Sequence, residues 1–174
     1  MENDKASTKK IIINYGIILG ITSVLLGVVM YVTNAYLDPS WIYSVAGILI
    51  LIGVISYGIK AYKTANQGYL NLSDALKVGI GIALIGGIIG AIWTFLLTSV
   101  IEPNYTQQML EVQREKLLEN PDMTEQIVDQ SMAIAEKMSS PYIQIAFSII
   151  GSLFFGFIIS LFAGLIMRKK QDLY

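Results

Sequence analysis

Four long apolar stretches alternate with short polar segments along this 174-residue chain. No Asp, Glu, Lys or Arg interrupts any of them, and each is close to the ~20 residues that a helix needs to cross a ~30 Å hydrocarbon layer. The pattern therefore predicts four membrane-spanning helices, at residues 11–32, 41–59, 78–101 and 142–167. The first is expected to be retained, because it is longer than the ~7–15 residues of a signal-peptide core.

Residues 102–141 form the one long polar segment. One helix is expected from Pro103 to Glu119, Asn120-Pro121-Asp122 interrupts it, and Asp122 is expected to cap a second helix. In that second helix four apolar residues recur at helical spacing and share one face: Met123, Ile127, Ile134 and Met138. We expect the first helix, the mouth of the bundle or a partner to cover this face. The fold class is thus all-α, a single four-helix transmembrane domain with an extracytoplasmic helical hairpin.

The short connections carry turn and cap residues. Asp38-Pro39-Ser40 predicts a tight turn before the second span, and Asn66-Gln67-Gly68 predicts a turn after it. Ser73 is the expected N-cap of the third span. Leu72 and Leu76 are then expected to lie along the membrane surface before the helix turns inward.

The cations divide unequally between the two sides of this topology. One side holds Lys5, Lys9, Lys10, Lys60, Lys63, Lys77, Arg168, Lys169 and Lys170, and the other holds Arg114, Lys116 and Lys137. Lys and Arg gather on the cytoplasmic side of membrane proteins. We therefore expect both termini in the cytoplasm and residues 102–141 in the periplasm of a bacterial inner membrane.

Small residues form stripes on two of the predicted spans. In lipid, such stripes let helix backbones approach closely. The fourth span carries Ser148, Ser152, Gly156, Ser160 and Gly164, and the third carries Gly79, Ala83, Gly87 and Ala91 on one line and Gly86, Gly90, Thr94 and Thr98 on another. Two interpretations stay open: packing within the chain, or one stripe of the third span facing another chain.

Composition narrows the chemistry. The chain is 54% hydrophobic with mean hydropathy +0.59, its net charge is −1, and it has no Cys and no His. Nucleic-acid binding, thiol chemistry, zinc sites and histidine acid–base catalysis are therefore not expected. The spans hold no residue that ionises near neutral pH, which proton-coupled carriers require. We expect no enzyme activity, no cofactor and no metal site.

The acids of residues 102–141 are spaced as on solvated helix faces and form no calcium loop. Arg114 and Lys116 lie among them, and we expect both to form ion pairs within their own helix.

Four short segments carry a resemblance that covers nearly the whole chain: 68–79, 101–105, Ser140-Pro141 before the fourth span, and the cationic end 167–170. Through them the chain resembles a family of small inner-membrane proteins from Bacteroidota that is known only as a domain of unknown function. It implies four spans and an outer helical segment. It implies no reaction, ligand or catalytic residue.

Two functional hypotheses remain. In the first, the protein is a structural or accessory component that packs against itself or a membrane partner, with the lipid bilayer as its solvent. In the alternative, it is a small oligomeric transporter or pore for a neutral or amphipathic solute. A cavity that crosses the whole bilayer, lined by Thr94, Thr98, Ser148 and Ser152, would favour the alternative.

Overall fold

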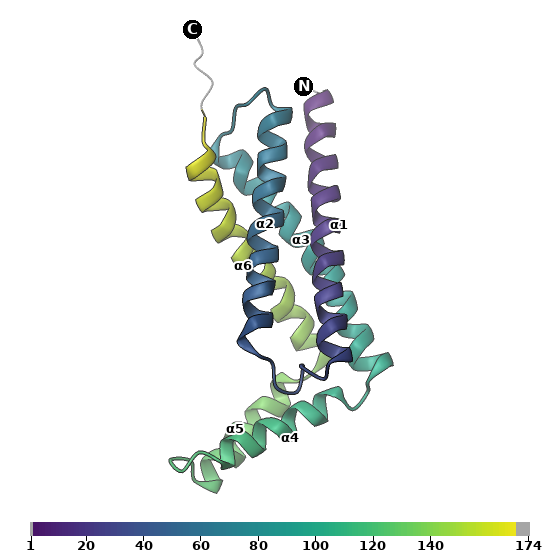
Figure 1. Cartoon of the computed structure of the whole chain (residues 1–174), viewed down its shortest axis with the longest axis vertical. Helices are drawn as coiled ribbons and strands as arrows, with labels where there is room; N and C mark the ends of the chain where they lie inside the picture. The colour runs from purple at the N-terminus through teal and green to yellow at the C-terminus, as the bar shows by residue number, and fades with distance from the viewer. Residues whose placement is uncertain (1, 170–174) are drawn as a thin grey trace.

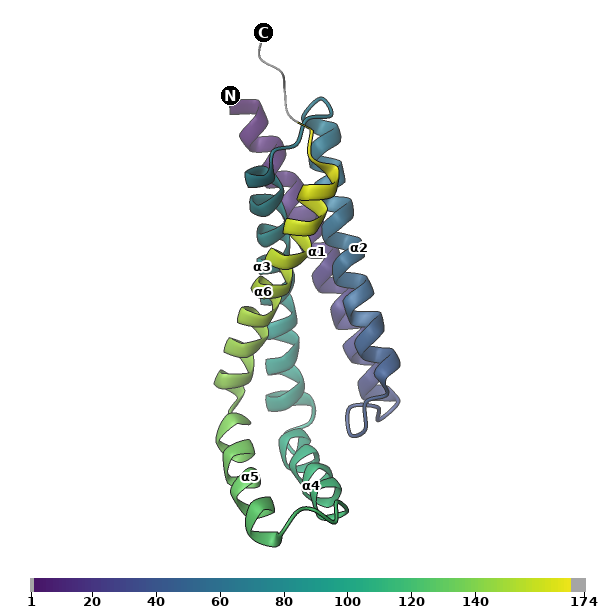
Figure 2. The same cartoon turned by 90° about the vertical axis from the view of Figure 1, so that its left-hand side faces the viewer.

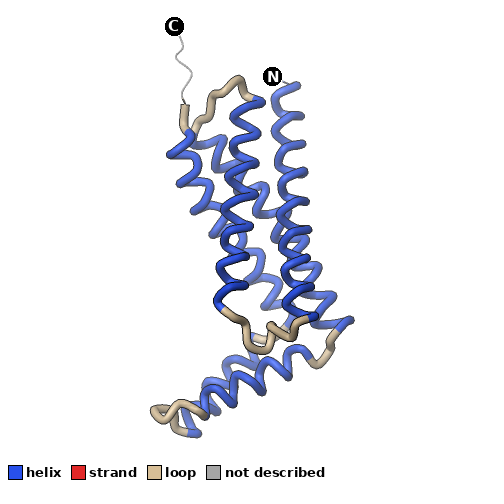
Figure 3. Tube along the Cα trace, viewed as in Figure 1, coloured by secondary structure: helices blue, strands red, loops and turns tan. Residues whose placement is uncertain are grey.

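A computed structural model describes residues 2–169, and within this range it confirms the all-helical fold (Figure 3). Four of the described helices are long and apolar enough to cross a membrane. They are α1 (Glu2–Val32), α2 (Trp41–Ala65), α3 (Leu72–Leu96) and α6 (Pro141–Met167). The five residues after α3, Leu97–Ile101, continue as one turn of π-helix, η1.

Three of the helices extend well beyond the apolar stretches that predict them. α1 begins at Glu2, α2 continues to Ala65, and α3 begins at Leu72. All three extensions lie at the same end of the bundle, where α1 begins and α6 ends (Figure 1). An apolar stretch marks only the part of a helix that lies in the hydrocarbon layer. Backbone hydrogen bonds can continue the helix beyond it, through turns that contain charged residues. We call this end the terminal end, and the opposite end the hairpin end.

Two of the predicted helix starts are wrong. Ser40 caps α2 as expected, its side chain accepting from the Ile42 backbone N–H at 3.5 Å. However, α3 begins after Asn71, so Ser73 lies inside the first turn and Leu72 and Leu76 belong to the spanning helix itself. The second outer helix is capped by Thr124, whose hydroxyl accepts from Ile127 N at 3.4 Å. Asp122 instead belongs to the turn, where its backbone N–H donates to Asn120 Oδ1.

Helix α3 makes the most extensive contacts in the bundle, chiefly with α6 and α1. The fully buried side chains concentrate in the half of the bundle near the terminal end: Ile55, Ile59, Leu70, Val78 and Ile82. Toward the hairpin end, the α1–α2 pair and the α3–α6 pair draw apart (Figure 2). The protein is thus tightly packed in one half and more open in the other.

The hairpin consists of α4 (Tyr105–Leu118) and α5 (Glu125–Met138), which contact each other. The two cations of α4 do not pair within that helix as the sequence suggested. Arg114 bridges to Asp129 on α5 at 2.9 Å, and Lys116 bridges to Asp38 in the α1–α2 loop. The acids at helical spacing from these cations are solvated, while the pairs actually formed hold α4 to α5 and to the bundle.

Candidate functional site

The α3–α6 seam brings the two small-residue stripes together in antiparallel register. A Cβ on Gly79 would overlap the Ser160 hydroxyl, and one on Gly156 would overlap the Ala83 Cβ. The facing pairs are Ala75 with Gly164, Gly79 with Ser160, Ala83 with Gly156, and Gly87 with Ser152. Steps of four residues on both helices keep the same partners in contact along the seam. This stripe of α3 is therefore occupied within the chain.

The second stripe of α3 is used only in part. A Cβ on Gly86 would lie 2.6 Å from the Leu19 side chain of α1, whereas one on Gly90 would meet nothing within 4 Å. From the other side, Gly16 and Gly20 of α1 receive the side chains of Ile85 and Ile89. Gly86 thus packs within the chain, and Gly90 faces open space.

Several hydroxyl side chains in the spans donate hydrogen bonds to the backbone of their own helices. Thr94 Oγ1 donates to Gly90 O at 3.1 Å, Thr98 Oγ1 to Thr94 O at 2.9 Å, and the buried Ser160 hydroxyl to Gly156 O. Such bonds to the preceding turn are common for Ser and Thr in apolar surroundings. No buried side-chain nitrogen or oxygen among the described residues lacks a partner.

Two adjoining cavities open in the half of the bundle near the hairpin end. The wider, of about 390 Å³, lies among all four spanning helices, and Ser148, Ser152 and Gly90 are part of its wall. The narrower, of about 150 Å³, is lined by Thr94, Thr98 and Gln144 together with aromatic side chains. Gly27 and Met30 belong to both walls. The four hydroxyl residues singled out from the sequence therefore do line cavities.

These cavities do not continue to the terminal end. There Ile55, Val78 and Ile82 are fully buried, and the close α3–α6 contacts at Gly79 and Gly156 leave no room between the helices. The described residues thus form a chamber in one half of the bundle, and they give no support to a solute path across the bilayer.

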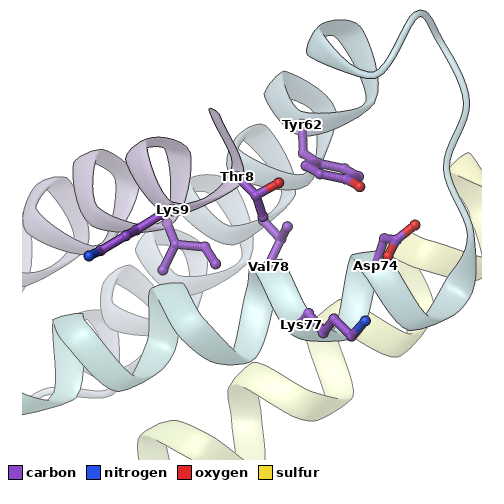
Figure 4. Close-up of a pocket in the computed structure, with 7 residues that line it drawn as sticks. Thr8, Lys9, Tyr62, Asp74, Lys77 and Val78 are labelled. Carbon is purple, nitrogen blue, oxygen red and sulfur yellow. The ribbon is translucent and has the colours of Figure 1, made fainter. Parts of the chain in front are cut away.

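A third pocket lies at the terminal end, between α1, α2 and α3 (Figure 4). Its volume is about 410 Å³, and Thr8, Lys9, Tyr62, Asp74 and Lys77 stand around it. In Figure 4 the Lys9 ammonium group extends away from Asp74. Lysines are expected at the cytoplasmic surface of any membrane protein. Their presence around this pocket is therefore no evidence for a ligand.

A short backbone pairing joins the α2–α3 loop to the residues that follow α6. Leu70 and Lys169 exchange two backbone hydrogen bonds of 2.9 and 3.1 Å, and Lys63 Nζ donates to Met167 O at 2.8 Å. The Lys169 ammonium lies 5.7 Å from the centre of the Tyr69 ring. The α2–α3 loop therefore holds the end of α6. The sequence gives little sign of this pairing, because a single β-bridge does not require the alternation of apolar and polar residues that marks a strand.

The hairpin is attached to the bundle through Tyr36. This nearly buried side chain donates to Gln108 Oε1 at 2.8 Å and stacks on Tyr105 with ring centres 4.9 Å apart. Burial raises the Tyr36 pKa, and the nearby Glu102 carboxylate and Tyr31 raise it further. Burial, followed by Tyr36, also raises the pKa of Tyr105. Both phenols stay protonated at neutral pH, so Tyr36 remains a donor to α4.

The apolar face expected on α5 is exposed. Ile127, Ile134 and Met138 keep 43%, 61% and 48% of their surface, and Met123 is half-buried. Instead α5 buries Val128, with Met132 and Ala135 half-buried one and two turns further on. Spacings of four and three residues mark this second apolar line, which the sequence interpretation missed. Neither α4 nor the bundle mouth covers the predicted face.

Comparison with known families matches residues 14–169 to the family described as "Protein of unknown function (DUF4199)". The chain belongs to this DUF4199 family. The match covers α1 from residue 14 onward, all of α2, α3 and α6, and the hairpin between α3 and α6. No curated protein and no solved structure matches the chain.

For this DUF4199 protein, the positions that sequence reasoning singled out thus fall into three places. The small residues of the first stripe meet in the α3–α6 seam, the hydroxyl residues line the two cavities, and the α5 face lies outside the bundle. Among the residues that the structure describes, no group of three or more acids is placed to hold a metal ion. The α5 face leaves Ile127, Ile134 and Met138 exposed on the hairpin.

Proposed function

We propose that this DUF4199 protein is a non-catalytic, accessory protein of the bacterial cytoplasmic membrane that acts by docking a partner. The partner is a second copy of the chain or another membrane protein. The observation that carries the proposal is the α5 face, where three large apolar side chains project from an extramembrane helix and remain exposed. Exposing such a face to water is unfavourable. Burying one large apolar side chain against a partner contributes about 1.5–3 kcal/mol to the free energy of association.

The internal packing supports the same role. The main small-residue stripe of α3 is occupied by α6, so it is not free for a partner within the membrane. The hairpin, by contrast, is attached to the bundle at Tyr36 and Lys116, while its α5 face remains exposed. A fixed hairpin presents its face in one orientation, which reduces the ordering cost of binding.

The proposal is tested by photo-cross-linking from a single cysteine. The chain has no cysteine of its own, so Ile134→Cys can be labelled selectively with a benzophenone maleimide in native membranes. We expect one discrete cross-linked product, at twice the chain mass for a second copy or at another fixed mass for a different protein.

Glu136→Cys is the matched control, because Glu136 is exposed on the opposite side of the same helix. It should give little or no product. Equal products from both positions, or none from either, would contradict the proposed docking face.

The proposed topology places both termini in the cytoplasm and the hairpin in the periplasm. The cations of α1, α2, α3 and the end of α6 support it, because Lys9, Lys60, Lys63, Lys77 and Lys169 all lie at or near the terminal end. Alkaline phosphatase fused near Asn120 should be active, and the same reporter fused after the last residue should be inactive. The reverse result would invert the proposed orientation.

A further inference from the structure

The two adjoining cavities at the hairpin end differ in character. The wider one is apolar apart from serine hydroxyls, with side chains such as Leu19, Leu26 and Phe155 in its wall. The narrower one combines aromatic rings with Thr98, Gln144 and the indole of Trp93. Neither wall contains a charged residue. Together they form an apolar chamber that adjoins a smaller, mostly aromatic one with several polar groups in its wall.

The narrow cavity offers unused hydrogen-bonding groups. Gln144 donates one amide N–H to Ser139 O at 2.9 Å, but its carbonyl oxygen accepts no bond from the described residues. The Trp93 indole N–H, which lies over Gly27, likewise has no acceptor among them. Since no buried polar side-chain atom in the described part of the chain lacks a partner, both groups keep accessible surface, and both residues line the narrow cavity.

The wide cavity lies in the half of the bundle where the α1–α2 and α3–α6 pairs draw apart (Figure 2). Two residues of its wall, Phe147 and Phe155 of α6, are 58% and 48% exposed. At its inner end the packed core around Ile82 and Ala83 closes it. This position would admit an occupant from the side of the bundle, and the packed core would stop it from going further.

We propose that these cavities bind one membrane amphiphile, with its acyl chain in the wide cavity and an uncharged head bearing hydroxyl or amide groups in the narrow one. The head would meet both a donor, Trp93, and an acceptor, Gln144. An anionic head is disfavoured, because no cation lines the site and a carboxylate lies nearby. Tyr36 in the wall bonds to Gln108, whose Nε2 donates to Glu102 Oε1 at 3.4 Å.

Intrinsic fluorescence tests this site in reconstituted full-length protein. The chain has two tryptophans, and Trp41 is 73% exposed, so Trp41→Phe leaves Trp93 as the only tryptophan, which can be excited selectively over tyrosine. Into nanodiscs of this variant we would titrate a monoacylglycerol dibrominated near its carbonyl end. We expect saturable quenching of Trp93 that unbrominated monoacylglycerol reverses. Quenching that rises linearly with mole fraction would overturn the proposal, because it reports only random lipid contact.

Glycine variants distinguish the cavity from other lipid contacts. A Cβ on Gly151, in the wall of the wide cavity, meets nothing within 4 Å, and the same holds for Gly53 in the groove between α1 and α2. Gly151→Leu should weaken the saturable quenching about tenfold or more, and Gly53→Leu should leave it unchanged. Equal effects of the two variants would overturn the site, and a brominated fatty-acid carboxylate that binds as well as the monoacylglycerol would overturn the uncharged head.

Discussion

Gly156 of α6 lies directly against Ala83 of α3, so closely that a single added methyl group on Gly156 would overlap the Ala83 side chain. Four such facing pairs hold the two helices together. Because the hydrophobic effect does not drive association between helices in lipid, close contact of this kind supplies the packing that stabilises the bundle.

Gly156→Ala should therefore destabilise the protein. The new methyl group forces the seam apart, at a cost of about 1–3 kcal/mol for overpacking. Gly151→Ala is the matched control, because nothing lies within 4 Å of its added Cβ, and it should be neutral or slightly stabilising. Thermal unfolding in detergent compares the two. A Gly156→Ala protein as stable as the control would mean that the α3–α6 seam does not form.

The bond between Tyr36 and Gln108 should control how firmly the hairpin is attached. Gln108→Leu removes the acceptor of a nearly buried phenol, which costs about 1–3 kcal/mol. Gln107→Leu changes the exposed neighbouring residue and should have little effect. Limited proteolysis of the hairpin in nanodiscs should be faster for Gln108→Leu alone. Equal cleavage rates in the two variants would show that Tyr36 does not hold α4.

Val128 and Ile127 are neighbours with opposite environments. Val128 is fully buried, whereas Ile127 is 43% exposed. Val128→Ser should loosen α5 from α4, since it places a hydroxyl in an apolar contact at a cost of about 1–3 kcal/mol. Ile127→Ser should leave that contact intact. Hydrogen exchange of the α5 amides measures the difference. Faster exchange in the Ile127 variant than in the Val128 variant would mean that Ile127, and not Val128, packs against α4.

Much of the fold could be predicted because local sequence determines it. Runs of apolar residues of membrane thickness mark α1, α2, α3 and α6 whatever surrounds them. Stripes of small residues indicated contact faces on α3 and α6, although the pairing of Gly79 with Ser160 depends on how the two helices are placed along each other. That relative placement has no signal in either helix alone.

The features that could not be predicted depend on residues far apart in the chain. Lys116 pairs with Asp38 and Tyr36 bonds to Gln108, in each case across more than seventy positions. The N-cap of α5 was predicted wrongly for a local reason. Asp122 and Thr124 are both good N-cap residues, but Asp122 is part of the turn in which its backbone N–H donates to Asn120 Oδ1. On α5 two apolar lines compete, and only contact with α4 decides that Val128 is the one buried.

The most direct test of the proposed role is the mass of the assembly extracted from native membranes in polymer nanodiscs. The account predicts that the wild-type protein is found in an assembly of fixed mass above that of one 19.2 kDa chain. It also predicts that Ile127→Ser with Ile134→Ser reduces this to a single chain, while the thermal stability of the bundle is unchanged. A wild-type protein that is already a single chain, or a double variant with the same assembly mass, would contradict docking through α5.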